Sequence, residues 1–142
     1  MTDPKNILVT GGAGFIGSHL VERLLAEGNA VTVIDDLSTG RLSNLRDVQS
    51  NPKLTVIESR ISDCKNLADV VGNSGAIFHL AAAVGVELVM TSGLRTIETN
   101  LRETQCILDA ASARKTPILI ASTSEVYGKS EKAAFAEEDD LL

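Results

Sequence analysis

The sequence predicts an α/β fold, a doubly wound parallel sheet with helices on both faces. Strand-like and helix-like segments alternate along the 142 residues, and a glycine-rich turn joins the first strand to the first helix. The expected strands lie near 6–10, 30–35, 54–58, 76–80 and 117–122, and the expected helices near 15–27, 63–72 and 95–114, with a short one near 42–48. With right-handed crossovers, we expect strand order 3-2-1-4-5 and a ligand crevice where the strands at 6–10 and 76–80 end.

The first strand and helix are joined by glycines with the spacing Gly11-x-x-Gly14-x-x-Gly17. The first glycine permits a tight turn, the second lets a pyrophosphate approach the backbone, and the third lets the helix pack on the sheet. Unpaired N–H groups and the helix dipole then favour a phosphate at this point. A plain glycine turn has the same local pattern, but the strand–turn–helix context favours a Rossmann-type dinucleotide site.

The second strand ends in two carboxylates, Asp35 and Asp36. An acidic residue about 20 positions after the glycines accepts hydrogen bonds from the adenosine ribose hydroxyls. The same charge repels a 2′-phosphate, so we expect NAD rather than NADP. The nearby Arg41 weakens that preference.

Composition restricts the function classes. The chain is 44% hydrophobic and 23% charged with net charge −6, which is ordinary for a globular protein and argues against a nucleic-acid partner. Cys64 and Cys106 lack metal-ligand spacing, so no metal site and a reduced, cytoplasmic environment are expected. The first residues have no signal-peptide character, and the apolar stretch 76–90 is too short to cross a membrane.

Two further segments follow strands at the expected crevice. The small residues 81–83 would let a nucleotide lie against the backbone, whereas the neighbouring His79 is expected to be a packed residue. Thr123, Ser124 and Glu125 follow the last strand and are candidates for catalysis. Turn capping explains such hydroxyls equally well.

Four blocks together resemble the extended short-chain dehydrogenases, and more narrowly the NAD-dependent nucleotide-sugar epimerases, dehydratases and decarboxylases. The blocks are Thr-Gly-Gly-Ala-Gly-Phe-Ile-Gly at 10–17, Asp-Asp-Leu-Ser-Thr-Gly at 35–40, His-Leu-Ala-Ala at 79–82 and Ser-Thr-Ser-Glu-Val-Tyr-Gly at 122–128. The resemblance is specific for the family and not for the substrate. It predicts an incomplete NAD-binding domain over 1–128. Residues 129–142 are mostly Lys, Glu, Ala and Asp, and this composition predicts an acidic, poorly ordered tail.

The resemblance implies oxidation of a nucleotide sugar at C4 by tightly held NAD, after which the 4-keto sugar is epimerised, dehydrated or decarboxylated. The residues that match cofactor positions are Gly11, Gly14, Phe15, Ile16 and Gly17 at the pyrophosphate, Asp35 and Asp36 at the ribose, Ser38, Thr39 and Gly40 near the adenosine, Arg60 and Ile61 at the adenine, Ala81, Ala82 and Ala83 beneath the cofactor, and Asn100 as a brace. Thr123 matches the hydroxyl that binds the sugar O4. Dehydratases usually have Asp-Glu at the positions of Ser124 and Glu125, so the resemblance makes dehydration less favoured. It favours a UDP-sugar 4-epimerase first and a nucleotide-sugar decarboxylase second.

Two cofactor positions depart from the family pattern. Arg60 stands where the family usually has an aspartate that accepts from the adenine amino group, and an arginine cannot accept a hydrogen bond. Arg60 could stack on the adenine, and Asp63 is the nearest substitute acceptor. In the helix at 95–114, Glu103 replaces the usual glycine of Asn-x-x-Gly-Thr.

The catalytic Tyr-x-x-x-Lys pair of the family is absent, because the only tyrosine, Tyr127, is followed four residues later by Glu131. We therefore expect the amino-terminal part of an enzyme, truncated before the catalytic helix and inactive alone, with a nucleotide-sugar substrate in the full-length enzyme. The alternative is a non-catalytic dinucleotide-binding module. An apolar stripe on the helix at 95–114 also predicts a homodimer or an aggregation-prone monomer.

Overall fold

The computed structural model describes residues 5–83, 86–128 and 134–139. Its five strands are β1 (Asn6–Thr10), β2 (Ala30–Asp35), β3 (Leu54–Glu58), β4 (Ala76–His79) and β5 (Ile118–Ile120). They pair in parallel in the order β3-β2-β1-β4-β5, which confirms the predicted strand order. The carboxyl ends of all five strands therefore meet at one edge of the sheet, where ligands bind in open α/β folds.

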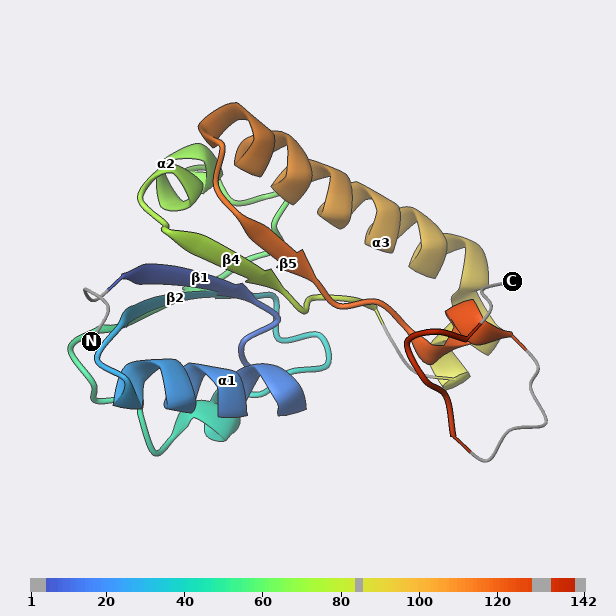
Figure 1. Ribbon diagram of the computed structural model, residues 1–142, viewed down its shortest axis with the longest axis horizontal. Helices are drawn as coiled ribbons and strands as arrows, with labels where there is room; N and C mark the ends of the chain where they lie inside the picture. The colour runs from blue at the N-terminus through green and yellow to red at the C-terminus, as the bar shows by residue number, and fades with distance from the viewer. Residues whose placement is uncertain (1–4, 84–85, 129–133, 140–142) are drawn as a thin grey trace.

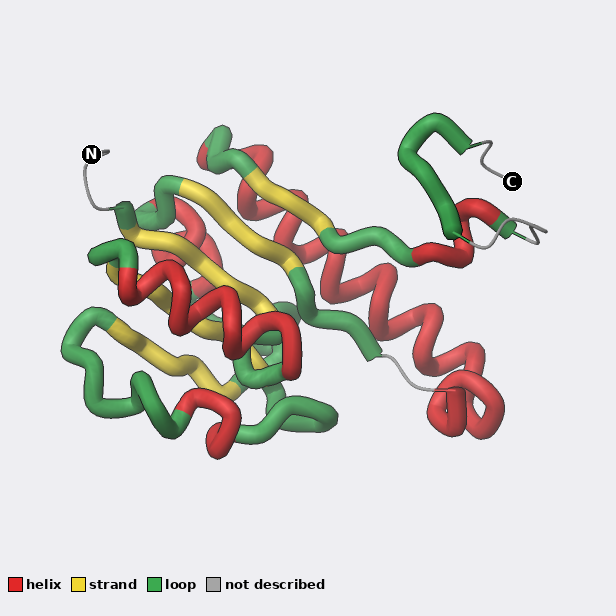
Figure 2. Tube along the Cα trace, turned by 60° about the horizontal axis from the view of Figure 1, so that its bottom comes forward, coloured by secondary structure: helices red, strands yellow, loops and turns green. Residues whose placement is uncertain are grey.

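Helices cover both faces of this sheet (Figure 1). The helical elements are α1 (Phe15–Ala26), α2 (Leu67–Gly72), α3 (Val86–Arg114) and the 3₁₀ turns η1 (Leu42–Leu45) and η2 (Ser124–Tyr127). One face carries α1 and the other carries α2 and α3. A second view shows α3 continuing beyond the ends of the strands (Figure 2).

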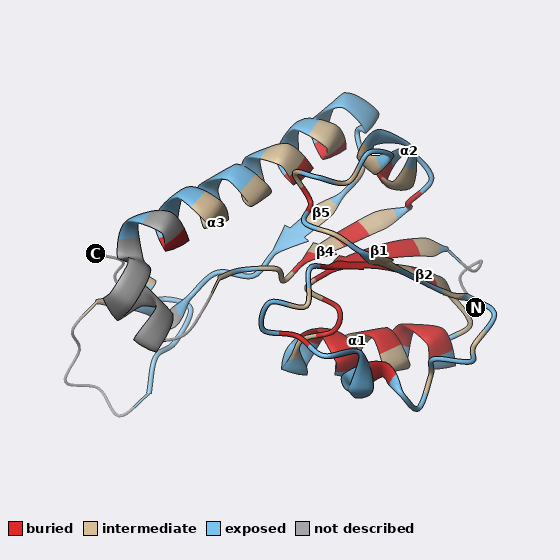
Figure 3. Cartoon of the chain, turned by 180° about the vertical axis from the view of Figure 1, so that it is seen from behind, coloured by how far each residue is buried: buried red, intermediate tan, exposed pale blue. Residues whose placement is uncertain are grey.

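Alternating side chains on the strands supply two separate cores. Ile7 and Val9 of β1 belong to the core beneath α1, whereas Leu8, between them, belongs to the core beneath α2 and α3. Ile107 and Ala111 of α3 complete the second core. Colouring by burial shows α1 with its sheet-facing side buried, whereas much of α3 remains exposed (Figure 3).

Three expected elements differ from the structure. The helix expected at 95–114 begins at Val86, because the single Gly93 costs only about 1 kcal/mol in a helix and does not end it. The helix expected at 63–72 begins at Leu67, since residues 60–64 form turns in which Asp63 N–H donates to the Arg60 carbonyl. The short helix expected near 42–48 is the 3₁₀ turn η1 (Leu42–Leu45), in which Leu45 is buried.

The acidic segment predicted at 129–142 lies partly outside the described residues. Within the part that is described, Phe135 stacks on Tyr127 with the ring centroids 4.9 Å apart. None of the helices, as far as the described residues extend, combines the length and apolarity needed to cross a bilayer.

Candidate functional site

A cavity of about 460 Å³ opens at the carboxyl edge of the sheet, between the glycine-rich turn, the end of β2, the loop after β3 and α3. This volume lies within the range of about 300–1,000 Å³ that is usual for small-molecule sites. Every residue that the sequence analysis assigned to the cofactor lines it: Gly11, Gly14, Phe15, Ile16, Gly17, Asp35, Asp36, Ser38, Thr39, Gly40, Arg60, Ile61, Ala81, Ala82, Ala83 and Asn100. The fold therefore brings five separate segments to one hollow.

The glycine-rich turn is packed so closely that side chains are excluded from it. Gly11 has φ +71°, and a Cβ atom there would lie 2.7 Å from the backbone nitrogen of Ala81. A Cβ on Gly17 would collide with the carbonyl oxygen of Gly11. The absence of side chains at Gly11 and Gly17 thus lets the backbone of the turn approach Ala81 and lets the start of α1 pack on the turn.

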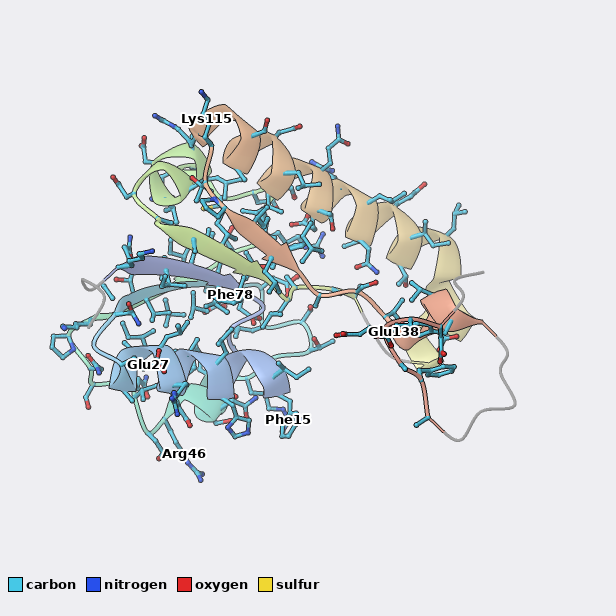
Figure 4. The ribbon with its side chains drawn as sticks, in the orientation of Figure 1. Phe15, Glu27, Arg46, Phe78, Lys115 and Glu138 are labelled. Carbon is cyan, nitrogen blue, oxygen red and sulfur yellow. The ribbon has the colours of Figure 1, made fainter. Side chains whose placement is uncertain are left out.

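The amino terminus of α1 opens into the cavity. Gly14 is its N-cap and supplies no side-chain hydrogen bond, so the first-turn N–H groups have no side-chain acceptor. Phe15 projects from the same turn and is 79% exposed (Figure 4). This combination of unpaired N–H groups and helix dipole is suited to an anion such as a diphosphate.

Asp35 connects the end of β2 to the glycine-rich turn. Its Oδ2 accepts from the backbone N–H of Ala13 at 2.9 Å, and its Oδ1 accepts from that of Leu37 at 2.9 Å. Gly40 lies so close that a Cβ there would stand 2.9 Å from Oδ1. Asp35 is 8% exposed and lines the cavity, and each carboxylate oxygen retains a lone pair for a further donor.

Asp36 is held in a different way, by its neighbours Ser38 and Arg60. Its Oδ1 accepts from the N–H and the hydroxyl of Ser38 at 3.0 and 2.6 Å, and Oδ2 lies 3.4 Å from Nε of Arg60. Partial burial raises the pKa of Asp36, but the Ser38 hydrogen bonds and the Arg60 charge outweigh it and hold the pKa below the usual value. Asp36 is therefore an anion at neutral pH, paired with Arg60.

Asn100 ties α3 to the segment after β4. Its Oδ1 accepts from the backbone N–H of Ala83 at 2.7 Å, and its Nδ2 donates to the Ala83 carbonyl at 3.2 Å. A two-point bond of this kind fixes both the position and the direction of the backbone. Residues 81–83 are thereby held along one wall of the cavity.

His79 is a packing residue in this structure. Its Nδ1 lies 2.7 Å from the Thr10 hydroxyl, and its Nε2 lies 3.1 Å from the Thr104 hydroxyl. Because the Thr10 oxygen also accepts from Ala81 N–H at 3.4 Å, we assign the hydroxyl proton to the Nδ1 bond and the ring hydrogen to Nε2. Burial lowers the pKa of His79, and the charge of Glu103 offsets part of that effect.

Thr123 and Glu125, two of the three predicted catalytic residues, are not among the residues that line the cavity, and the side chain of Ser124 lies outside the described part of the structure. Of the described side chains after β5, Ala121 is the one that lines it. Thr123 and Glu125 are exposed, and the Thr123 hydroxyl accepts from the Glu125 N–H at 3.3 Å as the cap of η2. The catalytic role of Thr123, Ser124 and Glu125 therefore stays a prediction from the resemblance.

The structure adds cavity residues that the sequence analysis did not assign: Ile34, Ser59, Leu80, Thr99, Glu103 and Ala121. Helical spacing was the available signal for Glu103, which follows Asn100 by three residues and so shares its side of α3. Asp63, considered above as a substitute acceptor, is exposed and is not part of the lining. Within the described ranges, no group of His, Cys, Asp and Glu side chains is arranged to hold a metal ion.

Comparisons with known proteins agree with this geometry. A family model described as GDP-mannose 4,6 dehydratase matches residues 8–141. The UDP-N-acetyl-alpha-D-glucosaminuronate decarboxylase of Bacillus cytotoxicus is 41% identical over 138 residues, which are 97% of this chain and 42% of that protein.

Solved structures are similar over nearly the whole chain. The UDP-N-acetylglucosamine 4-epimerase of Methanobrevibacter ruminantium, in complex with UDP-N-acetylmuramic acid, superposes with TM-score 0.88 at 32% identity, over 99% of this chain and 45% of that one. A double mutant of a dTDP-glucose 4,6-dehydratase from Streptomyces venezuelae, solved with NAD, superposes with TM-score 0.86 at 35% identity. The match covers 96% of this chain and 45% of that one. The chain thus spans less than half the length of each of these relatives.

Proposed function

Because this chain belongs to the family described by the GDP-mannose 4,6-dehydratase model, we propose that it binds NAD as the cofactor-binding part of a nucleotide-sugar-modifying enzyme. One observation carries the proposal. The Asp35 carboxylate is hydrogen-bonded to Ala13 of the glycine-rich turn and lines the same cavity as Gly14. A ribose acceptor and a diphosphate site are thus held in one rigid unit.

The diphosphate and the adenosine ribose each have a proposed partner in the cavity. The first-turn N–H groups of α1 bind the diphosphate, and Asp35 accepts from the ribose hydroxyls with the lone pairs that Ala13 and Leu37 leave free. The backbone of 81–83, held by Asn100, supports the cofactor along its length. These roles rest on the contacts of the chain itself and on the cavity volume.

The proposed chemistry begins with oxidation of the sugar at C4, for which NAD supplies the hydride acceptor. The residues of this chain bind and orient the cofactor, and Thr123 is proposed to hydrogen-bond the sugar O4. The 142 residues contain no Tyr-x-x-x-Lys pair, so we propose that turnover requires such a pair in addition.

Two fates of the oxidised sugar remain candidates. The Ser-Glu sequence at 124–125 favours 4-epimerisation over dehydration, and the similar Methanobrevibacter structure is that of a 4-epimerase. Decarboxylation is the second candidate, because the Bacillus decarboxylase is 41% identical over 97% of this chain. Both reactions share the initial oxidation, and therefore the same cofactor site.

Calorimetric titration with NAD and NADP tests the proposal. We expect NAD to bind and NADP to bind about tenfold more weakly or worse, because the carboxylates at the end of β2 repel a 2′-phosphate. Equal or tighter binding of NADP would contradict the ribose role of Asp35, and failure of both to bind would contradict the function itself. Incubation with UDP-glucose and with UDP-glucuronate should give no product, and turnover of either would refute the need for Tyr-x-x-x-Lys.

A further inference from the structure

Two residues that depart from the family pattern, Arg60 and Glu103, both line the cavity. Arg60 follows β3 and is paired with Asp36, and Glu103 projects from α3. Both line the same cavity as the carboxylates at the end of β2. If the ribose is bound by Asp35, as proposed above, the attached base extends toward the loop after β3, which carries Arg60 and is bonded to Glu103 through Ser62.

The Glu103 carboxylate is fixed in place before any ligand arrives. Its Oε2 accepts from the backbone N–H of Ser62 at 3.0 Å, and its Oε1 accepts from the Ser62 hydroxyl at 2.7 Å. Ser62 belongs to the loop after β3, so this two-point bond joins that loop to α3. A carboxylate has about four acceptor positions, and the two Ser62 bonds leave the others free.

Arg60 cannot take the same role. A guanidinium has only donors, and Nε of Arg60 is directed to Asp36 at 3.4 Å. Asp63, the nearest carboxylate in sequence, is exposed and does not line the cavity. Asp36 also lines the cavity, but Ser38 bonds its Oδ1 and Arg60 faces its Oδ2. Among the described residues of the lining, Glu103 is therefore the carboxylate we assign to a donor on the base.

We infer that Glu103 accepts a hydrogen bond from the exocyclic 6-amino group of the adenine and thereby determines which base the site accepts. This inference rests on the proposed binding of NAD. A 6-oxo purine presents an acceptor at the same position, and two acceptors facing each other repel. In this protein, the residue at the position of the usual family glycine thus forms the hydrogen bond that distinguishes adenine from a 6-oxo purine.

The test compares NAD with nicotinamide hypoxanthine dinucleotide, in which a 6-oxo group replaces the 6-amino group. A hydrogen bond to a charged group contributes about 1.5–3 kcal/mol, so the wild-type protein should bind NAD about 10- to 100-fold more tightly than the 6-oxo analogue. Glu103→Gln should reduce this ratio to near unity, because an amide presents either a donor or an acceptor. Titration calorimetry measures both dissociation constants.

Two further variants separate base reading from a structural effect. Ser62→Ala removes one of the two hydrogen bonds that hold the Glu103 carboxylate, so the preference for NAD should become smaller than in the wild-type protein but stay larger than in Glu103→Gln. Asp109→Asn removes one negative charge from an exposed position of α3 and should leave both affinities unchanged. Equal binding of the two dinucleotides by the wild-type protein, or an unchanged ratio in Glu103→Gln, would overturn the inference while NAD binding stands. Failure of the wild-type protein to bind either would overturn the proposed function, and this inference with it.

Discussion

The hydroxyl of Thr10 lies 2.7 Å from Nδ1 of His79, so a buried hydrogen bond joins the carboxyl ends of β1 and β4. These two strands are neighbours in the sheet, and the glycine-rich turn leaves β1 directly after Thr10. Nε2 of the same ring reaches Thr104, which extends the connection to α3. A neutral imidazole thus supports both walls of the cavity, and this has a consequence for stability at low pH.

The stability of the protein should fall as the pH drops below 6.5, the usual histidine value. Burial lowers the pKa of His79 in the folded state, so between that lower pKa and 6.5 the unfolded chain binds more protons than the folded one. The stabilisation is complete above this interval and is lost within it. Urea titrations from pH 7.5 to 4.5 would measure the free energy of unfolding.

Two variants serve as controls for the His79 prediction. His79→Gln should be less stable at pH 7, by about 1–3 kcal/mol for unsatisfied buried partners, and should show a smaller loss on acidification. His19→Gln, at an exposed position, should retain the wild-type pH dependence. A pH profile of His79→Gln identical to that of the wild-type protein would contradict the role given to burial.

Asp35→Asn should weaken both folding and NAD binding. The backbone N–H groups of Ala13 and Leu37 both point at the carboxylate, and an amide can present only one acceptor oxygen to them. A buried donor left unpaired costs about 1–3 kcal/mol, which denaturant titration can measure. Asp47→Asn, at an exposed surface position, is the matched control and should change neither quantity.

Gly17→Ala should be more damaging than Gly28→Ala. A Cβ on Gly17 would meet the carbonyl oxygen of Gly11, and overpacking of this kind costs about 1–3 kcal/mol or more. Gly28 has φ +89° with open space around it, so alanine there suffers only backbone strain of about 1–2 kcal/mol. Gly17→Ala should also abolish NAD binding, whereas Gly28→Ala should leave it intact. The reverse order of stabilities would show that the turn can relax around a methyl group.

The exposed stripe of α3 predicts self-association. Leu94, Ile97, Leu101 and Leu108 follow helical spacing, and Ile97 and Leu101 are 58% and 67% exposed. Light scattering should show a mass above that of one chain, and the double variant Ile97→Gln with Leu101→Gln should return it to one chain. Arg102→Gln, a change at a neighbouring exposed position, should leave the mass unchanged. A single-chain mass for the wild-type protein would refute the predicted homodimer.

Much of the fold followed from local pattern. The alternation of apolar strands with amphipathic helices determined a parallel sheet, and the strand order 3-2-1-4-5 agrees with the structure. The start of α3 was predicted nine residues too late, because glycine at 93 weakens a helix locally without ending it.

The cavity was predictable for a related reason. In a parallel sheet the segments after successive strands meet at one edge, so the glycine turn, Asp35 and residues 81–83 had to lie together. Sequence order alone therefore determined which segments surround the hollow.

Only the tertiary structure decided how individual side chains are used there. Asp35 bonds a residue 22 positions away, and Glu103 bonds Ser62, 41 positions away. Such pairings depend on the packing of α3 and the β3 loop, which no local pattern encodes. The cap that Thr123 forms with the N–H of Glu125 is a local bond, and turn capping was one of the two readings that the sequence allowed. That neither residue lines the cavity is decided by the tertiary structure.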